Sequence, residues 1–310
     1  MEVLWRYGGE ETEEREPGAE RDSWGTYCGL NKTKKKRGIY KSLVARFPHI
    51  EKKRLCSVLG ISRAGVYKGL SLIASRNEDL KQQILSVLSA HPSYGHRRIA
   101  IALSVNKKAV KRVMRLYKIK PYKRKGRWRK RRDERRPEAP YQNLIKGSFP
   151  DRAKVVYVGD FTYLRWKKRF VYLATFMDLF SREIVGWSVS TKHTKEFVLE
   201  AFLDGVMGSG LPKIVHTDQG SEYCSKEYHE FMSRLGVSIS MSKKGSPWEN
   251  GYQESFYNNF KTDLGLEFER FITIGELVEA IHQTINYYNK ERIHTKLKMS
   301  PLRFRQQRVY

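Results

Sequence analysis

Residues 213–223 read KIVHTDQGSEY, an apolar strand pattern that ends at an aspartate, Asp218. Residues 245–261 then read GSPWENGYQESFYNNFK, a helical pattern that carries Glu254. A third carboxylate, Asp160, follows the apolar run VVYV, and an ionised group in a buried strand is costly unless it is paired or binds a metal. Phosphodiester chemistry uses two hard cations about 3.5–4 Å apart, held by oxygen ligands. We therefore predict a divalent-cation site formed by these three side chains.

Each carboxylate also has a purely structural interpretation. The first aspartate could be a hydrogen-bonded residue at a strand end, and Asp218 precedes a glycine by two positions and could form a turn. Glu254 could be a solvated helix residue, with Glu249 as the rival ligand. Asp178, at another strand end, is more typical of a hairpin cap held by Arg182 than of a metal ligand.

The net charge indicates a polyanionic partner. The chain has 60 Lys and Arg against 33 Asp and Glu, a formal charge of +27. Nucleic acid is the first candidate and an anionic membrane surface the second. Apolar runs long enough to span a bilayer are missing, so we expect a cytoplasmic protein with no membrane partner. The three cysteines have neither disulfide-framework nor zinc-site spacing.

The composition changes along the chain predict five segments. They are a disordered acidic head (1–31), a helix-turn-helix (32–72), a second helix-turn-helix (73–120), a basic linker broken by prolines (121–150) and a larger catalytic domain (151–310). In the first helix pair Leu55, Val58 and Leu59 form one apolar face, and residues 60–62 form the turn. Such a pair can dock in the major groove, although short helix pairs also serve as plain packing units.

A dense basic stretch follows the second helix pair. Residues 107–136 contain 17 Lys or Arg and two acids, with three aromatic residues interleaved. Such a run can be a solvated face, but the mixture with aromatic residues favours phosphate contacts and base stacking. The candidate DNA-binding residues are Lys107, Lys108, Lys111, Arg112, Arg115, Arg127, Trp128 and Arg129, together with Arg63 in the first helix pair and Lys261.

The catalytic domain shows strand periodicity first and interleaved helices afterwards. Strands are expected at 155–164, 170–177, 183–189, 213–216 and 237–241, and helices at 194–207, 225–235, from about 250, and at 275–288. The first three strands should form an antiparallel group. The order of elements predicts an α/β fold, a mixed five-stranded sheet with helices on its faces.

Five further side chains could assist the carboxylates. Lys261 lies two helical turns after Glu254 on the same side, where it could contact phosphate or be a surface lysine. His216 and His294 could support the ligands or touch DNA, or could be packed structural histidines. Tyr252 and its neighbour Trp248 could stack on bases or pack internally.

Several motifs in order resemble those of bacterial insertion-sequence transposases with a retroviral-integrase-type DDE core, of the second-reading-frame type. The motifs are GDFTY (159–163), MDLFSREIVGW (177–187), HTDQGSEY (216–223), GSPWEN (245–250) with ESF (254–256), and a C-terminal set of Tyr288-Asn289, Arg292, His294 and Ser300-Pro301. Upstream, HPSYGHRRI (91–99) and LGISR (59–63) resemble the family's helix-turn-helix segments. The resemblance covers residues 50–308. Tyr157 and Glu249 depart from the family's usual tryptophan and aspartate.

The resemblance implies an RNase H-like core behind an all-α helix-turn-helix region. It also implies a metal-dependent polynucleotidyl transferase that binds element ends, nicks DNA and joins a 3′-hydroxyl to target DNA. Two Mg²⁺ ions, or Mn²⁺ in their place, would be held by Asp160, Asp218 and Glu254, with Asp160 bridging both. Its partners would be the terminal inverted repeats, the target DNA, further copies of the chain and an upstream-frame protein or fusion, in the bacterial cytoplasm and nucleoid.

Two other functions remain open. A non-catalytic DNA-binding regulator or inactive remnant would be expected to lack one of the three carboxylates, and none is missing. A plain metal-dependent nuclease would leave the two N-terminal helix pairs unexplained.

Overall fold

A computed structural model describes residues 35–122, 140–147, 149–243, 247–265 and 267–308. The chain divides into two compact units, Met1–Asp79 and Leu80–Tyr310. The predicted acidic head and the candidates Arg127, Trp128 and Arg129 lie outside the described residues. Within the described part, no helix is both long enough and apolar enough to cross a bilayer.

The first unit is a small helical cluster. Residues 35–46 are helical, and α2 (Lys52–Leu59) ends at Gly60, whose φ of 58° suits a left-handed cap. Its core includes Leu55 and partly buried Leu59, whereas Val58 is 78% exposed and does not share the predicted apolar face. The helix α3 (Arg63–Ala90) runs without a break across residue 72, where the sequence predicted a boundary, and its two glycines, Gly65 and Gly69, do not interrupt it.

The second unit begins with the end of α3 and a short helix pair, α4 (His96–Ala102) and α5 (Lys107–Leu116). Asn106 caps α5 by accepting a hydrogen bond from the Lys108 N–H (2.8 Å). The apolar sides of these helices bury one core. The fully buried members include Ile84, Tyr94, Ile99, Val110 and Val113.

A five-stranded mixed sheet of order β3-β2-β1-β4-β5 forms the centre of the second unit. Strands β1 (Val156–Trp166), β2 (Arg169–Asp178) and β3 (Ile184–Ser190) are antiparallel, whereas β4 (Ile214–Thr217) and β5 (Ser238–Met241) run parallel to β1. All five strands lie within one or two residues of the predicted ranges. The predicted α/β class with a mixed five-stranded sheet is confirmed.

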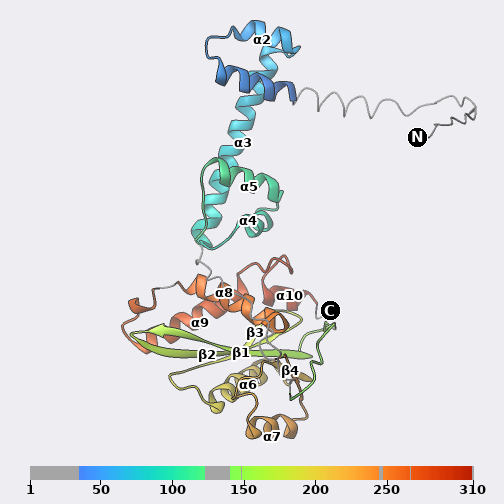
Figure 1. Cartoon of the computed structure of the whole chain (residues 1–310), viewed down its shortest axis with the longest axis vertical. Coiled ribbons are helices and arrows are strands. Elements are labelled where there is room, and N and C mark those ends of the chain that lie inside the picture. The colour runs from blue at the N-terminus through green and yellow to red at the C-terminus, as the bar shows by residue number, and fades with distance from the viewer. Residues whose placement is uncertain (1–34, 123–139, 148, 244–246, 266, 309–310) are drawn as a thin grey trace, which may run out of the picture. The chain divides into compact units, whose positions relative to one another are not determined.

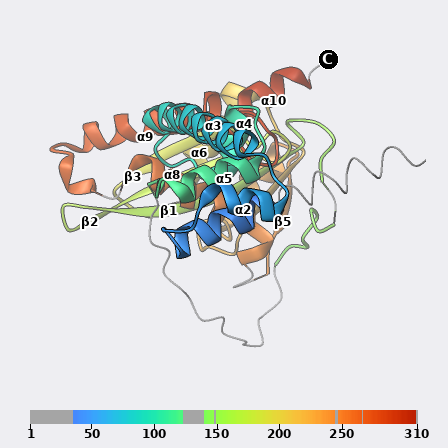
Figure 2. The same ribbon diagram turned by 90° about the horizontal axis from the view of Figure 1, so that it is seen from above.

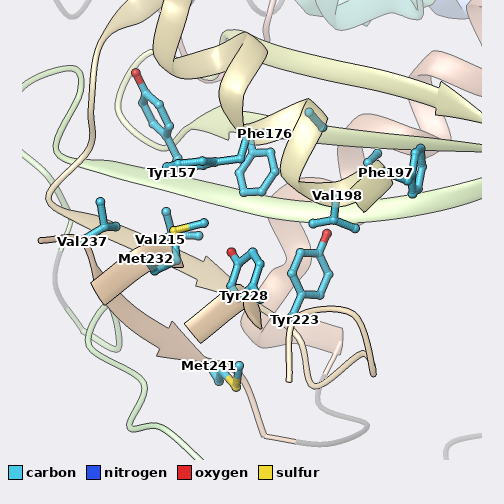
Figure 3. Packing of buried hydrophobic residues seen from close by; sticks show 13 residues of the cluster. Tyr157, Phe176, Phe197, Val198, Val215, Tyr223, Tyr228, Met232, Val237 and Met241 are labelled. Carbon is cyan, nitrogen blue, oxygen red and sulfur yellow. The ribbon is translucent and has the colours of Figure 1, made fainter. Parts of the chain in front are cut away.

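Helices cover both faces of this sheet (Figure 1). On one face α6 (Lys195–Ser209) packs against β3 and β2, and α7 (Lys226–Arg234) packs against β5. Side chains of both helices join one core with Tyr157, Phe176 and Val215 of the sheet (Figure 3). On the other face lie α8 (Gly251–Leu264), which follows the 3₁₀ turn Pro247–Asn250, and α9 (Ile274–Lys290). A second 3₁₀ turn (Phe268–Arg270) joins α8 to α9, and α10 (Pro301–Gln307) ends the described chain.

Two positions in the sheet domain have unusual backbone requirements, one on β3 and one in the turn between β1 and β2. Helix α6 approaches β3 so closely that a Cβ added at Gly186 would lie 2.3 Å from the backbone of α6. In the turn between β1 and β2, Lys167 and Lys168 have φ angles of 44° and 62°, the left-handed region that two-residue hairpin turns require.

A buried polar cluster, called the clasp here, joins the segment before α4 to helix α8 and the chain after α9. Asp263 of α8 accepts hydrogen bonds from Ser93 Oγ (2.5 Å) and from the guanidinium of Arg292. Arg98 and Arg292 both donate to Asn259 Oδ1, at 3.3 and 3.0 Å. The HPSYGHRRI segment, which resembles a helix-turn-helix motif, thus supplies contacts to the helix that carries Glu254.

The clasp continues through three aromatic rings. His91 Nδ1 lies 2.7 Å from the hydroxyl of Tyr287, and the His91 ring stacks on Tyr94 with centroids 4.4 Å apart. The Tyr94 hydroxyl accepts the backbone N–H of Ile293 (2.7 Å), and Arg98 Nε donates to the Ile293 carbonyl (2.9 Å). These contacts tie residues almost two hundred positions apart.

Candidate active site

Asp160 is the most strongly perturbed carboxyl group of the site. It lies on β1, the central strand, and its own carboxylate accepts the Phe161 N–H (2.8 Å). Burial and the nearby charges of Asp218 and Glu254 raise the pKa of Asp160 from 3.8 to about 8, against the lowering effects of the Phe161 N–H and of Lys261. Asp218 and Glu254 therefore lie near enough to affect Asp160, although the three residues come from separate elements.

Asp218 lies directly after β4, which pairs in parallel with β1. Its Oδ1 accepts the Gly220 N–H (2.9 Å), so Asp218 does form the turn that was the alternative interpretation. Burial is the largest cause of its raised pKa, and the charge of Glu222 contributes. The same side chain thus shapes the turn and contributes a carboxylate to the site.

Glu254 sits on α8, which two neighbouring side chains fasten to β1. Gln253 is fully buried and donates from Nε2 to the Val158 carbonyl (2.5 Å), and the Tyr257 hydroxyl donates to the Asp160 carbonyl (2.7 Å). These bonds set the register between the helix and the strand that carries Asp160. Sequence analysis did not single out either residue. The available signal was a polar pair four positions apart on an apolar helix face.

Glu249, the rival ligand, has structural partners in a different place. Its Oε2 accepts hydrogen bonds from the Lys243 N–H (2.8 Å) and from Asn143 Nδ2 (3.2 Å), so it ties the chain before α8 to the last part of the predicted basic linker. Between the two glutamates, Glu254 is the one whose charge raises the pKa of Asp160.

Glu222 is a buried carboxylate that sequence analysis did not select. It lies within the HTDQGSEY motif, and its Oε1 accepts Ser221 Oγ (3.0 Å) and lies 2.8 Å from His193 Nδ1. His193 in turn packs edge-on against Phe161, the residue after Asp160. The glutamate therefore links the Asp218 turn to the strand of the first aspartate.

Lys261 projects from α8 to β1. Its Nζ donates to Thr162 Oγ1 (2.6 Å) and to the Tyr163 carbonyl (2.9 Å), and its charge lowers the pKa of Asp160. The lysine therefore places a positive charge beside the carboxylates, as the seven-residue spacing from Glu254 predicts.

Of the two predicted histidines, His216 is fully buried and His294 is partly buried. His216 on β4 lies 2.9 Å from Ser240 Oγ on β5, and burial lowers its pKa to about 4. Burial also lowers the pKa of His294 to about 4, with further lowering by Arg182 and other cations. Both rings are neutral near pH 7, and His216 packs inside the sheet beside the Asp218 turn.

Asp178 caps the turn between β2 and β3. Its carboxylate accepts the Ser181 N–H (2.7 Å) and the Lys154 N–H (2.6 Å). The guanidinium of Arg182, expected to hold this aspartate, lies instead 3.9 Å from the ring centroid of Tyr252. Tyr252 therefore has an internal partner, and the side chain of its predicted companion Trp248 is outside the described part.

The sequence matches two families described as integrase core domain, over residues 150–247 and 235–301. The transposase for insertion sequence element IS904 of Lactococcus lactis subsp. lactis (strain IL1403) is 36% identical over 239 residues, covering 71% of this chain and 90% of that protein. The chain belongs to the insertion-sequence transposases with an integrase core. Membership of this family implies a polynucleotidyl transferase of the DDE type.

Two further proteins resemble this transposase. The putative transposase InsK for insertion sequence element IS150 of Escherichia coli (strain K12) is 30% identical over 260 residues, covering 80% of this chain and 90% of that protein. The HTLV-2 integrase catalytic core domain, in a structure with magnesium, is 21% identical with a TM-score of 0.40, covering 50% of this chain and 98% of that chain.

The carboxylates of this transposase do not form a closed ligand set. Over the residues that the structure describes, no three side chains of His, Cys, Asp or Glu are grouped so as to hold a metal ion. The donor atoms of Asp160, Asp218 and Glu254 are nevertheless all carboxylate oxygens, which suit a hard cation. Burial and two like charges disfavour the ionised form of Asp160, and a bound cation would favour it. The three residues therefore fit a divalent ion once their side chains converge.

The predicted DNA-contact residues of the transposase lie mainly on the outer side of α5. Lys107, Lys108, Lys111, Arg112 and Arg115 are all exposed there, opposite the buried apolar stripe of this helix. Arg63, at the start of α3, is also exposed. The basic residues are thus available to a polyanion.

Proposed function

We propose that this transposase binds the ends of its element, nicks the DNA there and joins the 3′-hydroxyl to target DNA. The observation that carries the proposal is that the charges of Asp218 and Glu254 both raise the pKa of the partly buried Asp160. Two-metal phosphoryl transfer needs carboxylates from separate elements around one site, and Asp218 and Glu254 raise the pKa of Asp160 from two other elements. A regulator that only binds DNA has no use for like charges placed this close to Asp160.

Asp160, Asp218 and Glu254 would hold two Mg²⁺ ions, or Mn²⁺ in their place. When bound, such ions lower the pKa of the attacking water or 3′-hydroxyl and stabilise the leaving oxygen. The hydrogen bonds of Gln253 and Tyr257 fix the position of the helix that carries Glu254 along strand β1. The Asp218 turn and the Glu254 side chain complete the cluster by moving toward Asp160.

Lys261 would place its ammonium group against the phosphate next to the scissile bond. Its present partners, Thr162 Oγ1 and the Tyr163 carbonyl, hold it at the strand that carries Asp160. A lysine neutralises phosphate as a point charge, so it can follow the phosphate through successive nicking and joining steps.

DNA would be held by the exposed basic face of α5 and the basic linker after it. This surface neutralises phosphates without reading sequence, so binding there should weaken steeply with salt. Arg63 would contact DNA from the first helix pair. Because two element ends must be joined in one event, we also propose that the active form is a homo-oligomer on DNA, assisted by an upstream-frame protein or a fusion to it.

The test is a nicking and joining assay on DNA that carries the sequences flanking this gene, with and without Mg²⁺. Wild type should nick and join, and Glu254→Gln should bind the same DNA but do neither. Glu249→Gln is the matched control, because Glu249 has backbone and amide partners and should retain chemistry. If wild type binds these ends and does not react even with the upstream-frame product present, the regulator or inactive-remnant function replaces this one. Nicking without joining would favour the plain nuclease.

A further inference from the structure

Two aromatic side chains stand exposed on the β1–β2 hairpin. Tyr163 is 54% and Phe170 50% exposed, and their rings meet edge-on with centroids 5.2 Å apart and planes at 79°. Tyr163 lies opposite Tyr172 and Phe170 opposite Arg165 in the hairpin register, so both rings share one face of the sheet. An edge-on pair leaves a ring face open to a third planar group.

This aromatic pair lies on the strand that carries Asp160. Strand β1 pairs with β4 only over Val156–Val158, but pairs with β2 as far as Trp166, so its second half has a free edge on the β4 side. The two views of Figures 1 and 2 both show the hairpin reaching past α6. Tyr163 follows Asp160 by three positions, about 10 Å along the strand, and the two side chains lie on opposite faces of the sheet. Lys261 connects the two places at the strand edge, because it donates to Thr162 Oγ1 and to the Tyr163 carbonyl.

The charged residues of the hairpin itself are all positive. Residues 161–177 contain no acidic residue, and Arg165, Lys167, Lys168 and Arg169 are exposed at the hairpin tip. The ammonium of Lys261 lies 5.3 Å from the centroid of the Tyr163 ring. Aromatic rings interleaved with cations are complementary to a nucleic-acid strand, whereas an apolar peptide would leave these charges without partners.

We propose that Tyr163 and Phe170 form a stacking platform for an unpaired nucleobase of the DNA strand whose phosphate lies at the carboxylates. This inference rests on the proposed function, because that function brings DNA to Asp160. A cross-strand aromatic pair also stabilises a hairpin, but that role does not require both rings to remain half exposed. Stacking of one base on an aromatic ring changes affinity by about 5- to 150-fold.

The experiment measures binding of a 20-nucleotide single strand that contains 2-aminopurine, next to a 20-base-pair duplex, without divalent metal. Wild type should quench the 2-aminopurine fluorescence. Tyr163→Ala and Phe170→Ala should each weaken single-strand binding by about 5- to 150-fold and reduce the quench, and Tyr163→Phe should keep both. Circular dichroism and thermal unfolding establish that each variant is folded, and Tyr163→Leu replaces the alanine variant if it is not.

Two controls separate stacking from other losses. Ile272→Ala removes a 72% exposed apolar side chain that has no ring, and should bind as wild type does. Arg165→Ala removes a charge, and should weaken single-strand and duplex binding alike and reduce their salt dependence.

Two outcomes would overturn the proposal: unchanged binding and quench in folded Tyr163→Ala and Phe170→Ala, or equal losses on single strand and duplex. The test is independent of catalysis. If the nicking and joining assay fails while the ring-dependent quench persists, the platform stands and the proposed chemistry does not. If DNA is nicked and joined but the fluorescence quench is absent, the stacking platform is refuted and the proposed function stands.

Discussion

Replacing Asp263 by alanine removes the only carboxylate named in the clasp, and should destabilise the second unit more than any surface change. The side chains of Arg292 and Asp263 are 2% and 7% exposed. Arg98 lies close by, and burial together with the charge of Arg292 lowers its pKa to about 10. Asp263→Ala therefore leaves two guanidinium groups without their counter-charge. Breaking a buried pair from one side costs about 3–5 kcal/mol.

In a unit of this size each kcal/mol shifts the unfolding temperature by about 2–4 °C, so we expect a fall of roughly 10 °C. Differential scanning calorimetry measures it. Glu279→Ala is the matched control: Glu279 pairs with His282 at an exposed site, and its loss should change stability by at most about 0.5 kcal/mol.

A compensating variant tests the reason for the loss. Asp263→Leu combined with Arg292→Met replaces the pair by apolar side chains, and should be more stable than Asp263→Ala because one of the two stranded charges is gone. Ser93→Ala removes one hydrogen bond to the carboxylate and should cost about 1.5–3 kcal/mol. An unfolding temperature for Asp263→Ala within about 2 °C of wild type would show that the clasp is not formed in solution, and the reasoning would fail.

Three other predictions follow from burial and close packing. The pKa of Asp160 is raised from 3.8 to about 8 in the metal-free folded protein. Between these two pH values the folded protein therefore keeps a proton on Asp160 that the unfolded chain has released. Wild-type stability should therefore fall as pH rises from about 4 to about 8, and Asp160→Asn should lack this fall in thermal unfolding without metal. His216 and His294, with pKa values lowered to about 4, act in the opposite direction: stability should fall as pH drops from about 6.5 toward 4, and His216→Gln should reduce that slope. Gly186→Ala should cost about 3 kcal/mol in chemical denaturation because its Cβ would lie 2.3 Å from the α6 backbone. Gly208→Ala, whose Cβ would lie 4.0 Å from the Val185 carbonyl oxygen, should be neutral or stabilising.

Local periodicity predicted the elements of the sheet domain well. Alternation along β1 and β2 and the helical spacing of α6 and α9 depend on neighbouring residues, which the sequence displays directly. The family motifs selected the three carboxylates, and the influence of Asp218 and Glu254 on the pKa of Asp160 agrees with a shared location, while their catalytic role stays a prediction. The metal, the DNA contacts and the domain boundaries stay predictions.

Long-range partners could not be predicted in the same way. Ser93 meets Asp263 and His91 meets Tyr287 across long stretches of chain, and nothing local in HPSYGHRRI indicates those contacts. The predicted apolar face of α2 was wrong at Val58, because helical spacing alone leaves the width of a buried stripe open.

The side-chain hydrogen-bond partners within the site could not be predicted from sequence patterns either. Glu249 could be told from Glu254 only once its bond to the Lys243 N–H was visible. The roles of Gln253 and Tyr257 depend on which strand carbonyls lie beneath them, which is a property of packing.

The turn between β1 and β2 holds two lysines, Lys167 and Lys168, in a backbone conformation that suits glycine and asparagine. Each such residue is less stable there by about 1–2 kcal/mol. A chain selected only for a stable hairpin would carry Asn-Gly at this tip and would lose two cations. The strained turn therefore marks a place where folding and positive charge favour different residues, and stabilising this protein there would make its hairpin less attractive to a polyanion.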